Sequence, residues 1–139
     1  MKYLLSLLSL FTLISCSSAP PAISIKPGEI SNYWVAKNEM STVIHSKKFG
    51  CGVFSSLQPE TSDQSSPSAL VEYTITERGA VEVLSVTDYK NGLSEKDLEL
   101  WINLINLSAL KTYDSALPSP QPITVSEYFY LNKSSKYCK

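Results

Sequence analysis

The fold is decided by residues 69–86, ALVEYTITERGAVEVLSV, in which two apolar segments flank a short turn. Apolar and polar residues alternate along the first segment, which is the period of a half-buried β-strand. Its inward-facing residues are Val71, Tyr73 and Ile75. The turn that follows, Glu77–Gly79, ends in a glycine, which adopts positive φ without steric cost. The whole stretch therefore predicts a β-hairpin.

The second strand of this hairpin, residues 80–86, changes phase along its length. Val81 and Val83 fall on one face, whereas Leu84 and Val86 fall on the other. A change of phase within one strand predicts either a β-bulge or a strand that is covered on both faces.

A helix is predicted next, over Glu95–Asn106. The Asn91–Gly92 pair marks a turn, and Ser94 is a good N-cap, with Asp97 at the spacing of a capping box. One apolar stripe of this helix faces a sheet and consists of Leu98, Trp101, Ile102 and Ile105. A second apolar stripe consists of Leu100, Leu104 and Leu107. The second stripe needs a cover of its own, which is either the segment Tyr33–Val35 or a partner protein.

A third strand is predicted over residues 123–131 (ITVSEYFYL), after the proline-rich segment Leu117–Pro122, which cannot be helical. One face is apolar except for a single acid, and consists of Ile123, Val125, Glu127, Phe129 and Leu131. Tyr128 and Tyr130 lie on the opposite face, either as ordinary strand surface or as a docking platform. The predicted fold class is therefore α+β, a small antiparallel sheet of about three strands packed on one main helix.

The N-terminal residues predict export. Met1–Lys2 supplies a positive charge, and residues 3–14 are an apolar run that is too short to cross a bilayer. The segment Leu13–Cys16 (LISC) resembles the bacterial lipobox. The resemblance implies that residues 1–15 are a lipoprotein signal peptide and that Cys16 becomes the acylated, palmitate-bearing N-terminus. The alternative is an ordinary signal peptide that is cut nearby, with Cys16 an incidental thiol.

The residues after the lipobox predict where the domain is held. Ser17 stands where an aspartate would favour retention in the inner membrane of enteric bacteria, so outer-membrane delivery facing the periplasm is expected. Residues 16–29 are rich in serine, alanine and proline and predict an extended tether. Residues 30–139 then form the folded domain.

The two remaining cysteines, Cys51 and Cys138, are expected to form a disulfide in the oxidising envelope. The alternatives are a metal site and a catalytic thiol. Neither has support from spacing, because the chain lacks a CxxC motif and His45 is its only histidine. No metal and no cofactor are therefore expected.

Composition narrows the function classes further. The chain has 139 residues, 43% of them hydrophobic, and a formal net charge of −1, which suits one domain and a processed leader. No basic run is dense enough to follow a nucleic-acid backbone. The chain also lacks a nucleophile-elbow motif and a phosphate-binding glycine loop, so the sequence does not predict an enzyme.

Residues 69–101, ALVEYTITERGAVEVLSVTDYKNGLSEKDLELW, together with the strand at 123–131, resemble the C-terminal domain of the TonB energy-transducer family. The resemblance implies a domain that grips the plug segment of outer-membrane receptors by strand addition. The family's transmembrane anchor and long proline-rich spacer are replaced here by the lipobox and a short tether. The binding half of the family's function is therefore what the resemblance predicts.

The sequence thus predicts a non-catalytic periplasmic lipoprotein that binds another envelope protein, such as an outer-membrane receptor or transport component. Residues 123–131 are expected to be an exposed sheet edge that takes up an extended peptide. The expected contact residues are Val125, Glu127, Tyr128 and Tyr130. The alternative is a structural or envelope-assembly lipoprotein that self-associates through the second helix stripe, and the oligomeric state stays open.

Overall fold

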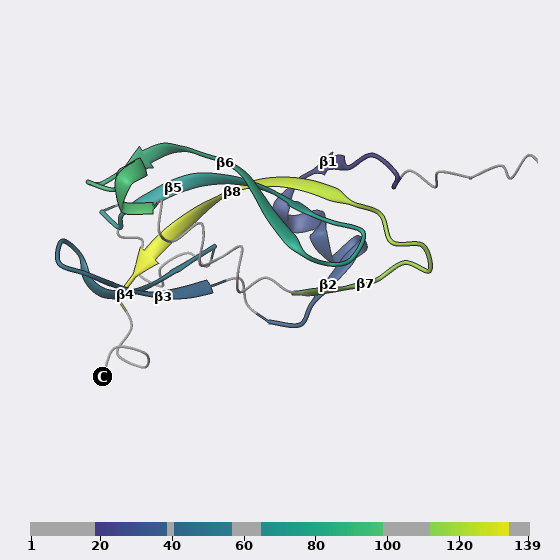
Figure 1. Cartoon of the computed structure of the whole chain (residues 1–139), viewed down its shortest axis with the longest axis horizontal. Helices are drawn as coiled ribbons and strands as arrows, with labels where there is room; N and C mark the ends of the chain where they lie inside the picture. The colour runs from purple at the N-terminus through teal and green to yellow at the C-terminus, as the bar shows by residue number, and fades with distance from the viewer. Residues whose placement is uncertain (1–18, 39–40, 57–64, 99–111, 134–139) are drawn as a thin grey trace, which may run out of the picture.

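In the computed structural model, the described residues are 19–38, 41–56, 65–98 and 112–133 (Figure 1). They are mostly β-structure, and no long helix lies among them. In chain order the elements are β1 (Ile23–Ile25), the 3₁₀ helix η1 (Pro27–Asn32), β2 (Trp34–Ala36), β3 (Ser41–Ser46), β4 (Gly50–Ser55), β5 (Ser68–Ile75), β6 (Val81–Lys90), β7 (Tyr113–Ser115) and β8 (Ile123–Asn132).

The main sheet has six strands and is built around β8. Its order is β3-β4-β8-β5-β6, and β1 pairs with the beginning of β8 beside that path. β5 runs antiparallel along one side of β8, and β4 pairs with the other side at residues 130–132. Figure 1 shows β8 crossing the centre of the curled sheet between β5 and β4. The last strand in the sequence is therefore the central strand of the sheet.

The core lies on one face of this sheet. Along β5 and β8 every second side chain points to that face, and all of these except the half-buried Glu127 are buried. They include Tyr73 and Phe129, whose rings meet edge to face at 6.3 Å. Phe54 of β4 contacts the same Phe129 ring at 5.4 Å. The other large buried side chains are Trp34, Ile44, Val71, Ile75, Leu98, Ile123 and Val125. A single apolar cluster thus joins the sheet to the segments that pack on it.

A second, two-stranded sheet pairs β2 with β7 in antiparallel register and closes over the tip of the β5–β6 hairpin. The Tyr113 backbone N–H donates to the carbonyl oxygen of Gly79 at 3.1 Å. The indole Nε1 of Trp34 donates to the carbonyl oxygen of Gln121 at 2.9 Å, just before β8. These bonds hold the small sheet against one end of the central strands, where β5 ends and where β6 and β8 begin.

The predicted hairpin is confirmed. β5 and β6 pair antiparallel, and Gly79 in the turn has φ +75°. A register shift between Tyr73 and Glu72 leaves Leu84 as the extra residue of a bulge, with its side chain 55% exposed. The bulge corrects one expectation, because it returns Val86 to the core face instead of leaving it with Leu84 on the other face.

The predicted fold class is wrong. A curled antiparallel sheet of five to six strands takes the place of a small sheet packed on one main helix. Among the strands that were not predicted, β3 and β4 are short and carry glycine, serine and histidine, so they lack a long alternating pattern. β6 also continues to Lys90, beyond the predicted end at residue 86.

The folded part of the chain begins before residue 30, within the range 16–29 that was expected to be a tether. β1 pairs in parallel with β8, with Ile23 opposite Ile123 and Ile25 opposite Val125. The Ile23 backbone N–H also donates to the Pro122 carbonyl oxygen at 3.1 Å. The sheet therefore begins within the segment that was expected to be an unpaired tether.

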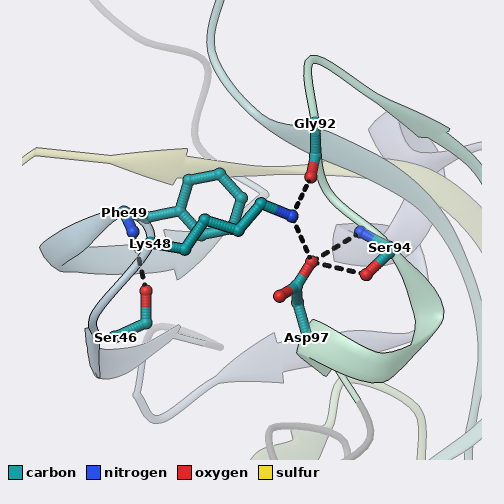
Figure 2. A network of polar contacts seen from close by, with 6 residues as sticks. All are labelled: Ser46, Lys48, Phe49, Gly92, Ser94 and Asp97. Carbon is teal, nitrogen blue, oxygen red and sulfur yellow. Dashed lines mark hydrogen bonds and ion pairs between the residues drawn. The ribbon is translucent and has the colours of Figure 1, made fainter.

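The start of the predicted helix is confirmed, since residues 95–98 form a helical turn, whereas residues 99–106 lie outside the described residues. Both the backbone N–H and the hydroxyl of Ser94 donate to Asp97 Oδ2, at 3.0 and 2.5 Å. Lys48, from the β3–β4 turn, donates to the same oxygen at 2.9 Å and to the Gly92 carbonyl oxygen at 2.5 Å (Figure 2). This network ties the β3–β4 hairpin to the segment after β6.

Candidate binding surface on the outer face of the sheet

The face of the main sheet opposite the core is called here the outer face. Residues directly opposite one another on paired strands share a face, so the strand registers define its membership. On β5 and β8 the outer-face residues include Leu70, Glu72, Thr74, Thr124, Ser126, Tyr128 and Tyr130, whereas Ser68, opposite Tyr130, is buried. On β3 and β4 they include Val43, His45, Cys51 and Val53. On β5 and β8 these side chains are half-buried or exposed, in contrast to the buried residues between them.

Tyr128 is fixed on this face by two charged residues of β6. Its hydroxyl donates to the carboxylate of Asp88 and accepts a hydrogen bond from Lys90 Nζ at 3.0 Å. Lys90 Nζ also lies 4.3 Å from the centre of the Tyr128 ring and 3.2 Å from Asp88 Oδ2. Tyr130 stands beside it, with 6.4 Å between the ring centroids. These four residues, Asp88, Lys90, Tyr128 and Tyr130, are called the Tyr128 cluster below.

The charges of the Tyr128 cluster stabilise one another. The hydrogen bond from Tyr128, followed by that from Lys90, holds the pKa of Asp88 below its ordinary value. The hydrogen bond to Tyr128, followed by that to Asp88, raises the pKa of Lys90. Both groups therefore stay ionised near neutral pH, and the cluster presents an ion pair and two aromatic rings on the surface.

Backbone geometry places Asp88 in this position. The strand register shifts between Ser68 and Leu70, so that β6 carries one extra residue at this point. Asp88 itself has φ +47°, in the left-handed region that aspartate tolerates better than most residues. The bulge thereby turns the Asp88 carboxylate toward Tyr128 on β8.

The four residues predicted to contact a partner are divided between the two faces. Tyr128 and Tyr130 lie on the outer face, as expected. Val125 is buried in the core with 1% exposure, so its side chain is not available to a partner. Glu127 also points to the core side, where its Oε1 accepts a hydrogen bond from Tyr73 at 2.6 Å.

The expectation that residues 123–131 form a free edge is wrong. β8 has β5 on one side, and β1 and β4 on the other, so a peptide cannot add along it. The ends of the strand order are β3 and β6. β6 carries two bulges and several charged residues, features that discourage edge-to-edge pairing. Because β8 is an interior strand, the candidate site is the outer face of the sheet and not a sheet edge.

Asp88 and Lys90 are the site residues that sequence reasoning missed. Their strand was expected to end before them, and the Asn91–Gly92 turn drew attention to the following helix. The signal that could have revealed them is the length of the second hairpin strand. When that strand is continued to Lys90, Asp88 and Lys90 lie level with Tyr128 and Tyr130.

His45 and Cys51 face each other across the β3–β4 hairpin on the outer face, with 4.0 Å between His45 Nε2 and Cys51 Sγ. Cys51 is disulfide-bonded. Cys16 and Cys138 lie outside the described residues, so both the lipidation of Cys16 and the pairing of Cys51 with Cys138 stay predictions. Within the described ranges, no three His, Cys, Asp or Glu side chains gather into a metal-binding group.

Comparison of the chain with models of protein families, with curated proteins and with solved structures finds no match. The TonB-type resemblance is therefore untested. None of the helices in the described part of the chain is long and apolar enough to cross a membrane.

Proposed function

We propose that this protein is a lipid-anchored lipoprotein of the bacterial envelope whose domain binds another envelope protein and catalyses no reaction. The anchor is supported by the lipobox-like segment Leu13–Cys16, and the short segment before β1 keeps the domain near the membrane surface. An outer-membrane receptor or transport component is the class of partner that the TonB-type resemblance suggests. In this proposal the partner docks on the outer face of the sheet.

The observation that carries the proposal is the Tyr128 cluster. Tyrosine is enriched at protein interfaces because it buries a large ring and keeps a polar end. Tyr128 and Tyr130 stand side by side on a half-buried face, and Tyr128 is already held by Asp88 and Lys90. A side chain that is ordered before binding loses less conformational entropy when the partner docks.

The side chains around the Tyr128 cluster suit the polar rim of a protein interface. Along β5 and β8, Ser126 Oγ donates to Glu72 Oε2 at 3.3 Å, and the hydroxyls of Thr74 and Thr124 lie 3.1 Å apart. On the other side of Tyr130, the outer face continues to Val53 and to Val43, which is 39% exposed. Aromatic residues are enriched in the core of protein interfaces, and a polar rim surrounds that core.

Site-specific photo-crosslinking in intact envelopes tests the proposal. A photoreactive amino acid at Ser126, exposed on the outer face next to Tyr128, is expected to give a discrete adduct with an envelope protein. The same amino acid at Asp114 on β7, which is also exposed, is the matched control and is expected to give none. Equal adducts from both positions, or none from Ser126, would contradict the proposal.

Self-association is the second candidate function, and one observation favours it. The β6 edge exposes Leu84, whose side chain is 55% accessible, at a bulge on a terminal strand. An adduct from Ser126 with a second copy of this chain, and a dimer on gel filtration of the lipid-free domain, would support self-association over binding to a different protein.

A further inference from the structure

The end of the domain at which β1 begins is built from two neighbouring segments that carry no charge. Residues 19–25 and 115–126 contain no lysine, arginine, aspartate or glutamate. The side-chain amide of Gln121 donates to the Pro21 carbonyl oxygen at 2.9 Å, and β1 pairs with the beginning of β8. Figure 1 shows the beginning of β1 and the β7–β8 connection at the same end of the molecule. This end, which consists of residues 19–25, residues 115–122 and β2, is called the β1 end below.

Exposed apolar side chains gather at the β1 end. Val35 on β2 is 56% exposed, Ile23 on β1 is 38% exposed, and Leu117 in the β7–β8 connection is 37% exposed. β2 pairs with β7, at the start of the same connection, and residues 116–120 (ALPSP) are all exposed. Exposed apolar surface of this kind marks a site of contact with a protein or a membrane.

The length of chain before β1 favours the membrane. Four residues, 17–20, separate Cys16 from Pro21, and Gln121 holds Pro21 to the domain. An extended chain spans at most about 3.5 Å per residue, so Pro21 lies within about 17 Å of Cys16. With acyl groups on Cys16, the β1 end therefore stays beside the bilayer surface. A tethered surface meets the lipid at a high effective concentration, so a few apolar side chains are enough for contact.

We propose that the β1 end rests on the lipid surface in which Cys16 is anchored, with Leu117 and Val35 among the lipid headgroups. This inference rests on the lipid anchor of the proposed function. β8 begins at the β1 end and runs toward the opposite end of the sheet (Figure 1). Tyr128 follows Ile123 by five residues, which is about 17 Å along a strand. The contact therefore holds the Tyr128 cluster away from the bilayer, where a partner can reach it.

The test uses the full-length, processed lipoprotein, purified in detergent and reconstituted into vesicles of phosphatidylethanolamine and phosphatidylglycerol. A diazirine-bearing amino acid replaces Leu117 in one sample and Val43 in the other. Val43 is the matched control, because its side chain is 39% exposed, against 37% for Leu117. It lies at the other end of the sheet, opposite Val53, which pairs with the last residue of β8. Both proteins must keep the wild-type circular dichroism spectrum.

After illumination, position 117 is expected to give phospholipid adducts, detected by mass spectrometry, in a yield on the order of ten times that from position 43. Flotation of each protein with the vesicles reports the acyl anchor separately. In a protein that floats, equal lipid adducts from both positions, or none from position 117, would overturn the membrane contact and leave the anchor intact.

Two other outcomes would also overturn the membrane contact. An adduct from position 117 with a second copy of the chain, in place of lipid, would assign the β1 end to self-association. A protein that does not float with the vesicles would exclude the anchor and the contact together. None of these outcomes bears on partner binding at the Tyr128 cluster.

Discussion

Tyr73 donates its hydroxyl proton to Glu127 Oε1 at 2.6 Å on the core side of the sheet. Tyr73 is fully buried, and Glu127 is the one carboxylate on the core-facing side of β8. Burial raises the pKa of Glu127 above its ordinary value of 4.5, and the hydrogen bond from Tyr73 only partly opposes this effect. Burial and the nearby Glu127 carboxylate also raise the pKa of Tyr73.

Replacing this acid should stabilise the protein at neutral pH. A carboxyl group whose pKa is raised by folding contributes stability while it is protonated, and that contribution is lost as the pH rises through the raised pKa. Glu127→Gln keeps an acceptor for Tyr73 but cannot ionise. We expect the variant to melt at a higher temperature than wild type at pH 7, and the difference to vanish near about pH 4. Glu72→Gln, on the outer face of the neighbouring strand, is the control. A Glu127→Gln variant that melts lower than wild type at pH 7 would contradict this account.

Gly79 should be the least replaceable glycine among the described residues. It has φ +75°, and a Cβ there would lie 2.0 Å from the Tyr113 carbonyl oxygen. Gly79→Ala is expected to cost about 2 to 4 kcal/mol in the free energy of unfolding, measured by urea denaturation. Gly92→Ala isolates the backbone cost, since Gly92 has φ +83° with open space around it, and should cost about 1 kcal/mol. Equal costs at the two positions would show that the contact with Tyr113 is unimportant.

Asp97 should contribute more to the stability of the fold than an ordinary surface carboxylate does. Hydrogen bonds from Ser94 and then from Lys48 hold the pKa of Asp97 below its ordinary value of 3.8. The stability that it contributes is therefore present above that value and lost as the pH falls through the lowered pKa. Asp97→Ala is expected to cost about 1 kcal/mol at pH 7, by loss of the cap, and less at low pH. The control, Asp114→Ala, breaks an exposed ion pair with Lys37 and should cost less than about 0.5 kcal/mol.

The anchor makes a prediction about the N-terminus of the mature protein. If the lipobox-like segment Leu13–Cys16 directs cleavage before Cys16, as proposed, mass spectrometry of the protein purified from membranes should show a chain that begins at Cys16 and carries acyl groups. Cys16→Ser is expected to release the domain from the membrane fraction. An unmodified N-terminus, or retention of residues 1–15 in a water-soluble protein, would exclude lipid anchoring.

The local patterns in the sequence predicted local structure well. Alternation at Val71, Tyr73 and Ile75, and at Phe129 and Leu131, assigned the core faces of β5 and β8, because a strand repeats every two residues. The phase change near Leu84 marked a real bulge. Ser94 and Asp97 marked the start of a helical turn.

The strand order could not be obtained in the same way. It depends on contacts between segments far apart in the chain, such as the parallel pairing of Ile23 with Ile123. β1 and β2 have only three residues each, too few to show a period. The prediction that β8 is an edge strand was wrong because the pairing of β1 and β4 with it could not be seen in the sequence. The Tyr128 cluster was missed because its two charged residues lie in the part of β6 beyond the predicted strand.

The most direct test of the binding surface repeats the crosslinking from Ser126 in a chain that carries Tyr128→Ala. Tyr128 is half-buried and holds Asp88 and Lys90, so the substitution should cost about 1 kcal/mol in the free energy of unfolding and leave the domain folded. If the outer face is the docking surface, the yield of the adduct should fall about tenfold, as expected for the loss of a central aromatic contact. An adduct of undiminished yield in this folded variant would contradict the account.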